Sequence, residues 1–329
     1  MPSIQNNIHK VDHLTLFDTF FGSEENHQIC YPKDHRTFVL SIILLAILLV
    51  LLVIVIIIIV KRNSKIIADK LELIESKNKD LLDSINYAQR IQKAIIPTQE
   101  ELGGCWENHF VFYQPKDIVS GDFYWTHHTD TEKYIAIIDC TGHGVSGAFM
   151  SLLGFNAINN AVKINNITNP TEILHFMNTE IKNILHQSNE SELSDGMEIA
   201  LCVLDKKNLK LKYAGANRPL YLYKDEKLIV INPTKCSVGS IQSHVLEPPT
   251  TVTIDINRGD VFYLFTDGIP DQMGGKKGKK FLTAGLKSLI SELNQVNFDK
   301  QGVAFEKAIT DWQGKEIQTD DMLFMGVKI

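Results

Sequence analysis

The feature that most constrains this chain is an apolar run from Phe38 to Val60. Ser41 is the only polar residue in it. An apolar run of about 20 residues is long enough to cross a bilayer as a helix. This run is too long and too far from the N-terminus for a signal peptide, and no small-residue cleavage site follows it. Its length and purity also disfavour a buried core helix. The sequence therefore predicts one transmembrane helix over residues 38–60.

Basic residues flank the apolar run unequally. Lys33 and Arg36 precede it, whereas a larger group follows it, namely Lys61, Arg62, Lys65 and Lys70. Because cytoplasmic flanks carry the excess of Lys and Arg, the imbalance places the part after the run in the cytoplasm. It predicts a single-pass protein of the cytoplasmic membrane. Residues 1–37 would then be a short extracytoplasmic tail, too small to form a core of its own.

Residues 61–97 are predicted to form a helical connector with a coiled-coil pattern. Its seam positions alternate spacings of four and three residues: Ile67, Leu71, Ile74, Asn78, Leu81, Ile85, Ala88, Gln92 and Ile95. An Asn at an a position, such as Asn78, favours a two-stranded, in-register pair. The pattern therefore predicts a homodimer through the connector, and Pro97 is expected to end the helix.

The alternative for the connector is an amphipathic helix packed on its own domain. For residues 84–96 the two interpretations are equally supported, because Ala88 and Gln92 make a weak seam. A weak seam leaves two packings close in free energy, and a switch needs that closeness. We therefore expect the connector to transmit a signal to the domain that follows it, and expect Gln92→Leu to favour one of the two packings.

Residues 104–329 have the composition of a globular domain. Strand-like runs come in pairs, as in Ala200–Asp205 and Leu209–Tyr213, which a turn-like Lys206-Lys207-Asn208 separates. Helical patterns also come in pairs, over residues 147–163, 171–187, 281–293 and 299–310. Strands in groups and helices in groups indicate an α+β fold, an antiparallel β-sandwich flanked by helices, rather than a doubly wound sheet.

Charge and cysteine content exclude several classes of function. The net charge of -6 gives no electrostatic footprint for nucleic acid. The five cysteines are scattered and form no CxxC pair, which argues against a zinc site and against a disulfide framework. Cys140 has no evident neighbouring base in the sequence, so we interpret it as a small buried residue rather than a nucleophile.

Aspartates stand in turn-like contexts beside Gly or a second acid, and most of them follow strand-like apolar runs. They are Asp122, Asp139, Asp267 and Asp320. A carboxylate at the mouth of a buried strand is costly unless a cation meets it. Several together indicate a divalent-cation site with oxygen ligands, which suits Mg²⁺ or Mn²⁺. Any one of them alone would be interpreted as a helix cap or an Asx-turn.

A series of short motifs runs through residues 85–329: Ile85–Gln92, Pro115–Tyr124, Asp139–Gly144, Ala214–Pro219, Thr266–Gly268 and Thr319–Met322. Together, and in this order, they resemble the metal-dependent serine/threonine protein phosphatases of the PPM superfamily, in particular the bacterial sporulation stage II protein E type. The resemblance implies α-β-β-α layers. It also implies two divalent cations about 3.5–4 Å apart that activate a water for in-line attack on phosphorus.

The resemblance implies a role for each acid. Asp139 is similar to the carboxylate that bridges both metal ions. Cys140 stands at the position whose backbone carbonyl ligates one of them. Asp122 resembles a ligand of the second ion or the residue that holds its water. Asp267 and Asp320 resemble the remaining carboxylates of the first ion.

Some assignments stay open. Asp321 is the alternative to Asp320, because adjacent acids leave the register ambiguous. His143 is a candidate general acid for the leaving oxygen, although the histidine of the eukaryotic relatives corresponds more closely to Thr141. Those relatives also hold phosphate with an arginine for which we find no clear counterpart, and Lys116 is the nearest candidate.

The resemblance and the apolar run together predict a membrane-anchored protein serine/threonine phosphatase. Its substrate would be a phosphorylated cytoplasmic regulatory protein, in this branch commonly an anti-sigma-factor antagonist. One alternative is a non-catalytic dimeric membrane scaffold, which the presence of all four acids disfavours. The other is a metal-dependent hydrolase of small phosphoesters such as nucleotides.

Overall fold

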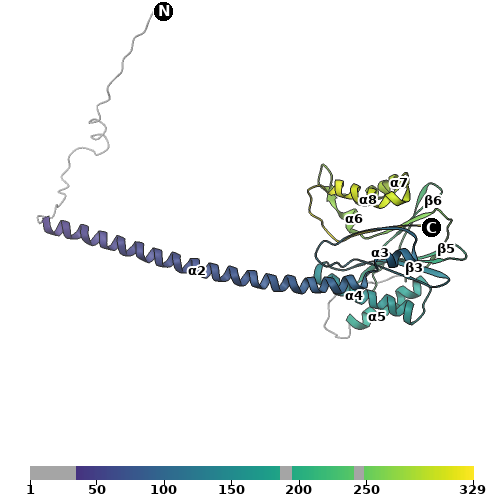
Figure 1. The fold of residues 1–329 in the computed structure, drawn as a ribbon, viewed down its shortest axis with the longest axis horizontal. Coiled ribbons are helices and arrows are strands. Elements are labelled where there is room, and N and C mark those ends of the chain that lie inside the picture. Colours follow the sequence, from purple (N-terminus) through teal and green to yellow (C-terminus); the bar gives the residue numbers. More distant parts are fainter. Residues whose placement is uncertain (1–34, 186–194, 241–247) are drawn as a thin grey trace, which may run out of the picture. The chain divides into compact units, whose positions relative to one another are not determined.

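Figure 1 shows the computed structural model of the 329-residue chain, which describes residues 35–185, 195–240 and 248–329. The chain divides into two compact units, Met1–Ser76 and Lys77–Ile329. Most of the tail predicted over residues 1–37 lies outside the described residues, as does Cys30. All the strands in the described ranges belong to the second unit.

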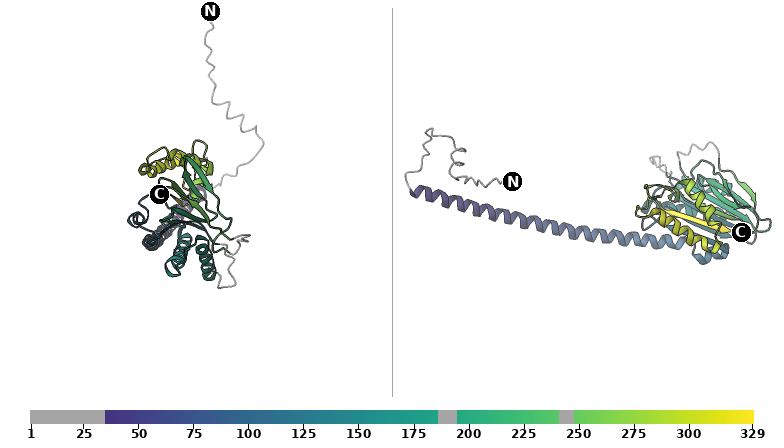
Figure 2. Two further views of the ribbon diagram at one scale, coloured as in Figure 1. Left: turned by 90° about the vertical axis from the view of Figure 1, so that its right-hand side faces the viewer. Right: turned by 90° about the horizontal axis from the view of Figure 1, so that it is seen from above.

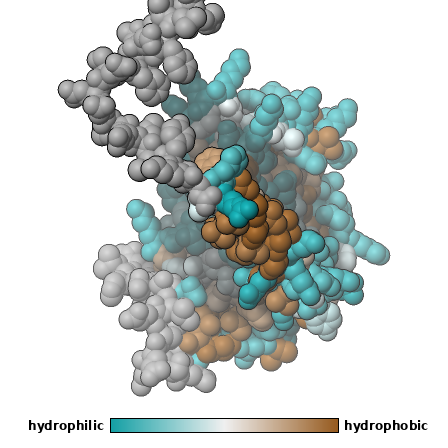
Figure 3. All heavy atoms as spheres, turned by 90° about the vertical axis from the view of Figure 1, so that its left-hand side faces the viewer, coloured by the Kyte–Doolittle hydropathy of each residue, from teal (hydrophilic) through white to brown (hydrophobic). Residues whose placement is uncertain are grey.

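The described part of the first unit is the N-terminal portion of helix α2, His35–Ile95. The apolar run from Phe38 to Val60 lies in this helix, and its large side chains are exposed in the isolated chain, forming the brown surface of Figure 3. An 18-residue window reaches a mean hydropathy of 4.1, so the helix is long and apolar enough to cross a membrane. An exposed apolar surface of this size marks a site that lipid or protein covers.

The second unit is built on two five-stranded sheets, seen from further sides in Figure 2. The strand order in the first sheet is β1 (Asn108–Gln114), β12 (Met322–Lys328), β9 (Val261–Phe265), β6 (Leu220–Lys224) and β7 (Lys227–Ile231). The order in the second sheet is β2 (Phe123–His128), β3 (Glu132–Cys140), β4 (Met197–Asp205), β5 (Lys210–Ala216) and β8 (Val252–Asp255). Neighbouring strands in both sheets are antiparallel, as the grouping of strands predicts.

Pairs of helices cover the outer face of each sheet (Figure 1). The second sheet packs against α4 (Gly144–Asn159), its π-helical continuation η1 (Asn160–Ile164) and α5 (Pro170–Leu185). The first sheet packs against α7 (Leu282–Leu293) and α8 (Phe298–Gln313). The predicted α+β sandwich of antiparallel sheets with flanking helices is therefore confirmed.

The remaining elements are short. Helix α3 (Gln99–Cys105) precedes β1, and helix α6 (Gly268–Asp271) follows β9. The strands β10 (Met273–Gly274) and β11 (Lys279–Lys280) form a small hairpin.

Strand β3 explains why the sequence specifies a sandwich. Tyr134, Ala136 and Ile138 pack on the side of α4 and α5, whereas Ile135 and Ile137 pack between the two sheets. Because successive side chains of a strand point to opposite faces, a strand covered on both faces needs an unbroken apolar run. The run Tyr134–Ile138 provides it, and all five residues are at most 1% exposed.

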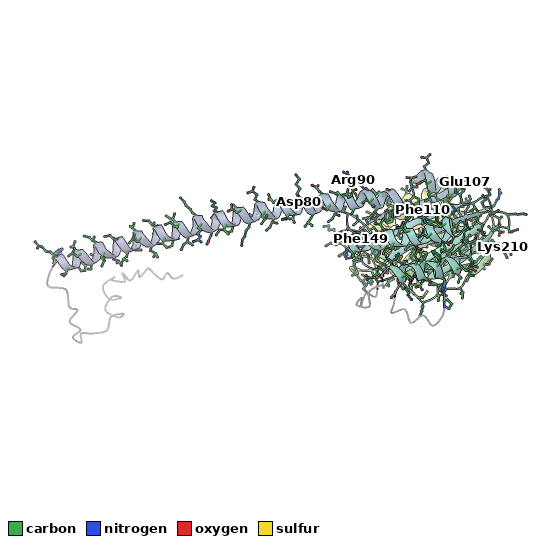
Figure 4. All side chains as sticks on the ribbon, turned by 90° about the horizontal axis from the view of Figure 1, so that it is seen from below. Asp80, Arg90, Glu107, Phe110, Phe149 and Lys210 are labelled. Carbon is green, nitrogen blue, oxygen red and sulfur yellow. The ribbon has the colours of Figure 1, made fainter. Side chains whose placement is uncertain are left out.

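The C-terminal part of α2 belongs to the second unit and contacts it from Ile85 onward. Residues 77–84, which include Asp80, are exposed, as is Arg90 (both labelled in Figure 4). Ile85 and Ala88 are half-buried, and Gln92 is 4% exposed. For residues 84–96 the structure thus favours a helix packed on its own domain over a seam that faces a second copy. The coiled coil before this segment stays a prediction.

Candidate active site

The predicted acids meet at one end of the sandwich. Asp139 near the end of β3 lies opposite Glu198 near the start of β4, Asp267 follows β9, and Asp320 precedes β12. In an antiparallel pair, the end of one strand and the start of its neighbour lie at the same edge. These four carboxylates accordingly line one cavity of about 250 Å³, which His143 also lines.

A buried arginine stands among these carboxylates. Nη2 of Arg218 contacts one oxygen from each of three acids, at 2.7 Å from Asp139 Oδ2, 2.5 Å from Glu198 Oε2 and 2.8 Å from Asp267 Oδ2. The residue is 6% exposed. Burial alone would lower the pKa of Arg218, but the three carboxylates outweigh burial and raise it. The guanidinium is therefore a fixed positive charge in the cavity.

The turn after β5 positions the side chain of Arg218 next to the acids. Asn217 takes a positive φ of 57°, a conformation in which Asn is enriched. Its Nδ2 donates a hydrogen bond to Glu198 Oε1 at 3.0 Å. The hydroxyl of Tyr213 donates to the carbonyl oxygen of Arg218 at 2.5 Å. The backbone on both sides of the guanidinium-bearing side chain is thus held in place.

Asp139 has a strongly shifted pKa. Burial raises the pKa of Asp139 to about 7; Arg218 opposes this rise, and Asp267, Glu198 and Asp320 add to it. Oδ2 of Asp139 forms an ion pair with Arg218 at 2.7 Å but has no hydrogen-bond partner among the described residues. The pKa of Asp320 is also raised, first by burial.

Asp122 is a further buried carboxylate near Asp139, although it is not among the residues that line the cavity. The residue is 3% exposed, and burial followed by the neighbouring Asp139 holds its pKa well above its usual range. Its backbone is fixed by Ser120 Oγ, which accepts from Asp122 N–H at 3.0 Å, and by the Tyr113 hydroxyl, which donates to its carbonyl oxygen at 2.9 Å. Asp122 Oδ2 has no partner in the described part of the chain.

These residues fit divalent cations in their chemistry. The donors are carboxylate oxygens, which suit Mg²⁺ and Mn²⁺, and a buried oxygen without a partner, such as Asp122 Oδ2, costs about 1–3 kcal/mol unless a cation or donor meets it. As the side chains lie, no three acids, histidines or cysteines of the described residues converge as ligands. Arg218 takes up oxygens of three of the acids instead.

The structure separates the adjacent acids Asp320 and Asp321. Asp321 is 2% exposed, and its two oxygens accept backbone N–H groups, from Lys116 at 2.7 Å and from Gly121 at 2.8 Å. Its carboxylate therefore anchors the loop that leads to Asp122. Asp320 lines the cavity, and this geometry favours Asp320 over Asp321 as a candidate ligand.

The thiol of Cys140 is buried, as the sequence predicted for this small residue. The side chain is 4% exposed within the core under α4, and burial raises the pKa of the thiol well above its usual range. Gly121 approaches this turn so closely that an added Cβ would lie 2.5 Å from Gly142 O and 3.1 Å from Cys140 O. Gly142 has a φ of +88°, which glycine adopts without strain.

His143 lies at the mouth of the cavity, before the first turn of α4. Its Nδ1 is 2.7 Å from Asp117 Oδ2, and its Nε2 is 3.1 Å from Lys116 Nζ. If Nδ1–H donates to the carboxylate, Nε2 is left to accept from the ammonium. The two candidates named from the sequence for proton transfer and for phosphate, His143 and Lys116, thus contact each other.

Sequence reasoning missed Glu198 and Arg218. Glu198 is the one acid near the start of the apolar strand β4, and Arg218 lies inside the motif Ala214–Pro219. The sequence shows that an acid and an arginine stand at these positions. It does not show the strand register that places Glu198 opposite Asp139.

Comparison with known proteins identifies the class of this domain. The SiaA-PP2C domain of Pseudomonas aeruginosa matches with a TM-score of 0.69 and 29% identity over 77% of this chain and 98% of that domain. The second unit is accordingly a PP2C-type phosphatase domain. The family model described as stage II sporulation protein E (SpoIIE) matches residues 129–329, and the chain belongs to this family.

Two further solved structures share the fold. The phosphatase domain of SpoIIE from Bacillus subtilis, with a fragment of its regulatory domain, has a TM-score of 0.55 and 18% identity over 68% of this chain and 63% of that one. The RsbU and RsbW domains of a Mycobacterium tuberculosis protein have a TM-score of 0.53 and 18% identity over 67% of this chain and 59% of that one. None of the curated proteins matches the chain.

We expect Gly121→Ala to disrupt the site, because the new Cβ would meet the Gly142 carbonyl oxygen at 2.5 Å. Overpacking of this kind costs about 1–3 kcal/mol and would shift the Cys140–Gly142 turn. Denaturant unfolding and phosphatase assays should show losses of both stability and turnover.

The matched control is Gly104→Ala in α3, where an added Cβ meets nothing within 4 Å. It should preserve turnover and, as a helical Gly→Ala change, stabilise slightly. Equal behaviour of the two variants would contradict the close approach.

Proposed function

We propose that the protein is a membrane-anchored protein serine/threonine phosphatase that uses two divalent cations, Mn²⁺ or Mg²⁺, to hydrolyse phosphoserine or phosphothreonine on a cytoplasmic regulatory protein. The observation that carries the proposal is the carboxylate cavity. Asp139, Glu198, Asp267 and Asp320 line it together with the buried guanidinium of Arg218. Membership of the SpoIIE family supports the reaction class.

The residues proposed to hold the cations are Asp139, Asp122, Asp267, Asp320 and the backbone carbonyl of Cys140, with Glu198 as an addition from the structure. Bound divalent cations supply Lewis acidity, lower the pKa of a water and neutralise charge on the phosphoryl group. Like-charged carboxylates this close repel one another. The protein's part is to hold them at the ends of rigid strands of both sheets, so that the repulsion does not separate them.

Lys116 and His143 are proposed to act at the cavity mouth. Nζ of the half-buried Lys116 lies 3.1 Å from His143 Nε2, and Asp117 orients the opposite ring nitrogen. An ammonium here attracts a phosphate dianion as a point charge. A histidine whose Nδ1 is fixed by a carboxylate presents Nε2 in one orientation, from which it can hold a proton for the leaving oxygen.

The cavity favours a phosphorylated protein over a nucleotide. Its volume is about 250 Å³, and no Phe, Tyr or Trp is among its described lining residues. A nucleotide site usually offers an apolar or aromatic surface for the base, whereas a phosphorylated side chain needs only a short polar cavity at the surface. A larger cavity of about 570 Å³ near Trp106 and Arg258 has none of the four carboxylates.

Activity should require a divalent cation and the acids of the cavity. We expect the fragment Lys77–Ile329 to hydrolyse a phosphoserine protein in Mn²⁺ or Mg²⁺ and to lose activity in chelator. Asp139→Asn should lower kcat by about a hundredfold or more, as loss of an electrostatic group in an active site does, while circular dichroism stays unchanged. Asp255→Asn, at a side chain 86% exposed, is the matched control. Full turnover in chelator, or a preference for nucleotides, would reject the proposed reaction.

Membrane anchoring and dimerisation are proposed for α2. The apolar segment supports anchoring, with the phosphatase domain in the cytoplasm because of the basic residues after Val60. Beyond it, Ile67, Leu71 and Ile74 keep the heptad spacing and are 54–58% exposed in the single chain. An isolated helix with an exposed apolar seam is marginal in water, which favours a paired helix.

A fragment that starts at Asn63 should therefore be a dimer at about tens of micromolar, the range expected of a short coiled coil. A fragment that starts at Lys77 lacks Ile67, Leu71 and Ile74 and should be mainly monomeric. It keeps the packed residues after Ile85, so its fold is preserved. Sedimentation equilibrium of the two fragments measures the difference. Identical monomeric behaviour would reject the coiled coil.

The connector is also proposed to influence the site, through Gln92 rather than through a seam. Its Nε2 donates to Ser120 O at 2.6 Å and to Ser151 Oγ at 2.9 Å, and its Oε1 accepts from Ser120 N–H at 3.1 Å. Ser120 Oγ in turn accepts from Asp122 N–H. A shift of the helix at Gln92 would therefore reach the candidate ligand Asp122 within two hydrogen-bond steps.

Gln92→Leu should consequently weaken the domain instead of strengthening a dimer. It leaves the buried N–H and carbonyl of Ser120 without their partner, at about 1–3 kcal/mol for each buried group. We expect lower stability in denaturant and a several-fold loss of kcat at saturating metal. Arg90→Leu, on the exposed side of the same helix, should change neither. A Gln92→Leu protein of unchanged stability and turnover but tighter self-association would restore the seam interpretation.

A further inference from the structure

Arg218 has a role that the proposed reaction does not use. It is the only Lys or Arg among the described residues that line the carboxylate cavity. Four acids line the same cavity, and three of them each have an oxygen within 2.5–2.8 Å of the same nitrogen, Nη2. A guanidinium with three carboxylates on one nitrogen is more crowded than a bidentate ion pair with one acid. The three carboxylates thus converge on the guanidinium group of Arg218.

The oxygens that Arg218 occupies are those a metal ion needs. Oδ2 of Asp139 and Oδ2 of Asp267 lie 2.7 and 2.8 Å from its Nη2. A Mg²⁺ ion binds carboxylate oxygens at about 2.0–2.1 Å. A dication at that distance and a guanidinium nitrogen in contact with the same oxygens would repel each other strongly. The two cations are therefore alternatives for these acids.

The backbone of Arg218 is held by hydrogen bonds, whereas the described contacts of its side chain with the acids are ion pairs. The Tyr213 hydroxyl and the bond from Asn217 N–H to Thr234 O at 2.9 Å fix the turn. By contrast, the buried Nε of Arg218 has no hydrogen-bond partner in the described residues. The guanidinium is thus held by its ion pairs, so neutralising the acids removes what holds it.

We propose that Arg218 is an internal counter-ion that keeps the metal-free carboxylates together, and that a divalent cation must displace it from Asp139 and Asp267. This inference rests on the proposed metal site. It assigns Arg218 a positioning role, in which the ion pairs lower the apparent metal affinity. The cation concentration at which the enzyme becomes active is then set by Arg218 as well as by the ligands.

The test compares the full-length protein in detergent with its Arg218→Gln variant, by thermal unfolding followed through tryptophan fluorescence, in chelator and in saturating Mn²⁺. In chelator, Arg218→Gln should unfold several degrees lower, because removing one partner leaves buried charges unpaired. In saturating Mn²⁺ the difference should disappear. By linkage, the Kd for Mn²⁺ should fall about tenfold, equivalent to about 1.4 kcal/mol. Arg258→Gln, an exposed arginine at the other cavity, has the same charge change and should match wild type.

The outcomes separate this inference from the proposed function. If Mn²⁺ raises the unfolding temperature equally in wild type and Arg218→Gln, the counter-ion role is wrong and the proposed metal site is retained. A stability loss of equal size in chelator and in Mn²⁺ shows a purely structural arginine and also overturns it. If neither Mn²⁺ nor Mg²⁺ changes the unfolding temperature of wild type or of any variant, both the counter-ion role and the proposed metal site are rejected. If Arg218→Gln does not fold, Arg218→Lys serves, and its loss of stability must again shrink when Mn²⁺ is added.

Discussion

The contact of one guanidinium with three carboxylates is the interaction on which the rest of this site depends. Asp139 and Glu198 belong to the second sheet, whereas Asp267 follows β9 of the first. The ion pairs of Arg218 therefore join the two layers of the sandwich at the end where the site lies. A buried cluster of acids without this cation would be costly. The site and the joint between the sheets are thus the same set of side chains.

The loop before Asp122 is held from two sides. Gln92 of α2 satisfies both backbone groups of Ser120, and the carboxylate of Asp321 accepts the N–H of the next residue, Gly121. Gly121 in turn packs on the Gly142 carbonyl with no room for a side chain. Two buried side chains far apart in sequence therefore position one loop, and that loop sets the depth at which Asp122 is buried.

The sequence predicted what depends on local pattern and missed what depends on register. Strand-like runs in pairs, such as Ala200–Asp205 and Leu209–Tyr213, predicted the sandwich of antiparallel sheets that the structure shows. Acids beside glycines indicated the site. The resemblance favoured Asp320 and left Asp321 as the alternative, and the structure distinguishes them, because Asp320 lines the cavity whereas Asp321 accepts two backbone N–H groups. Arg218 was missed because its target acids come from other strands.

Helix α2 combines three environments in one continuous segment, and their order has a physical consequence. Its apolar part needs lipid or protein to cover it, the part from Ile67 to Ile74 has no partner within the described chain, and the part from Ile85 onward is packed on the phosphatase domain. Only the last part is stabilised by the domain itself. Among the residues of this last part, Gln92 is the buried one, and its hydrogen bonds end on the loop of Asp122. Asp139 raises the pKa of Asp122, and Arg218 opposes the rise in the pKa of Asp139, so the loop that Gln92 holds and the buried guanidinium both lie close to one carboxylate.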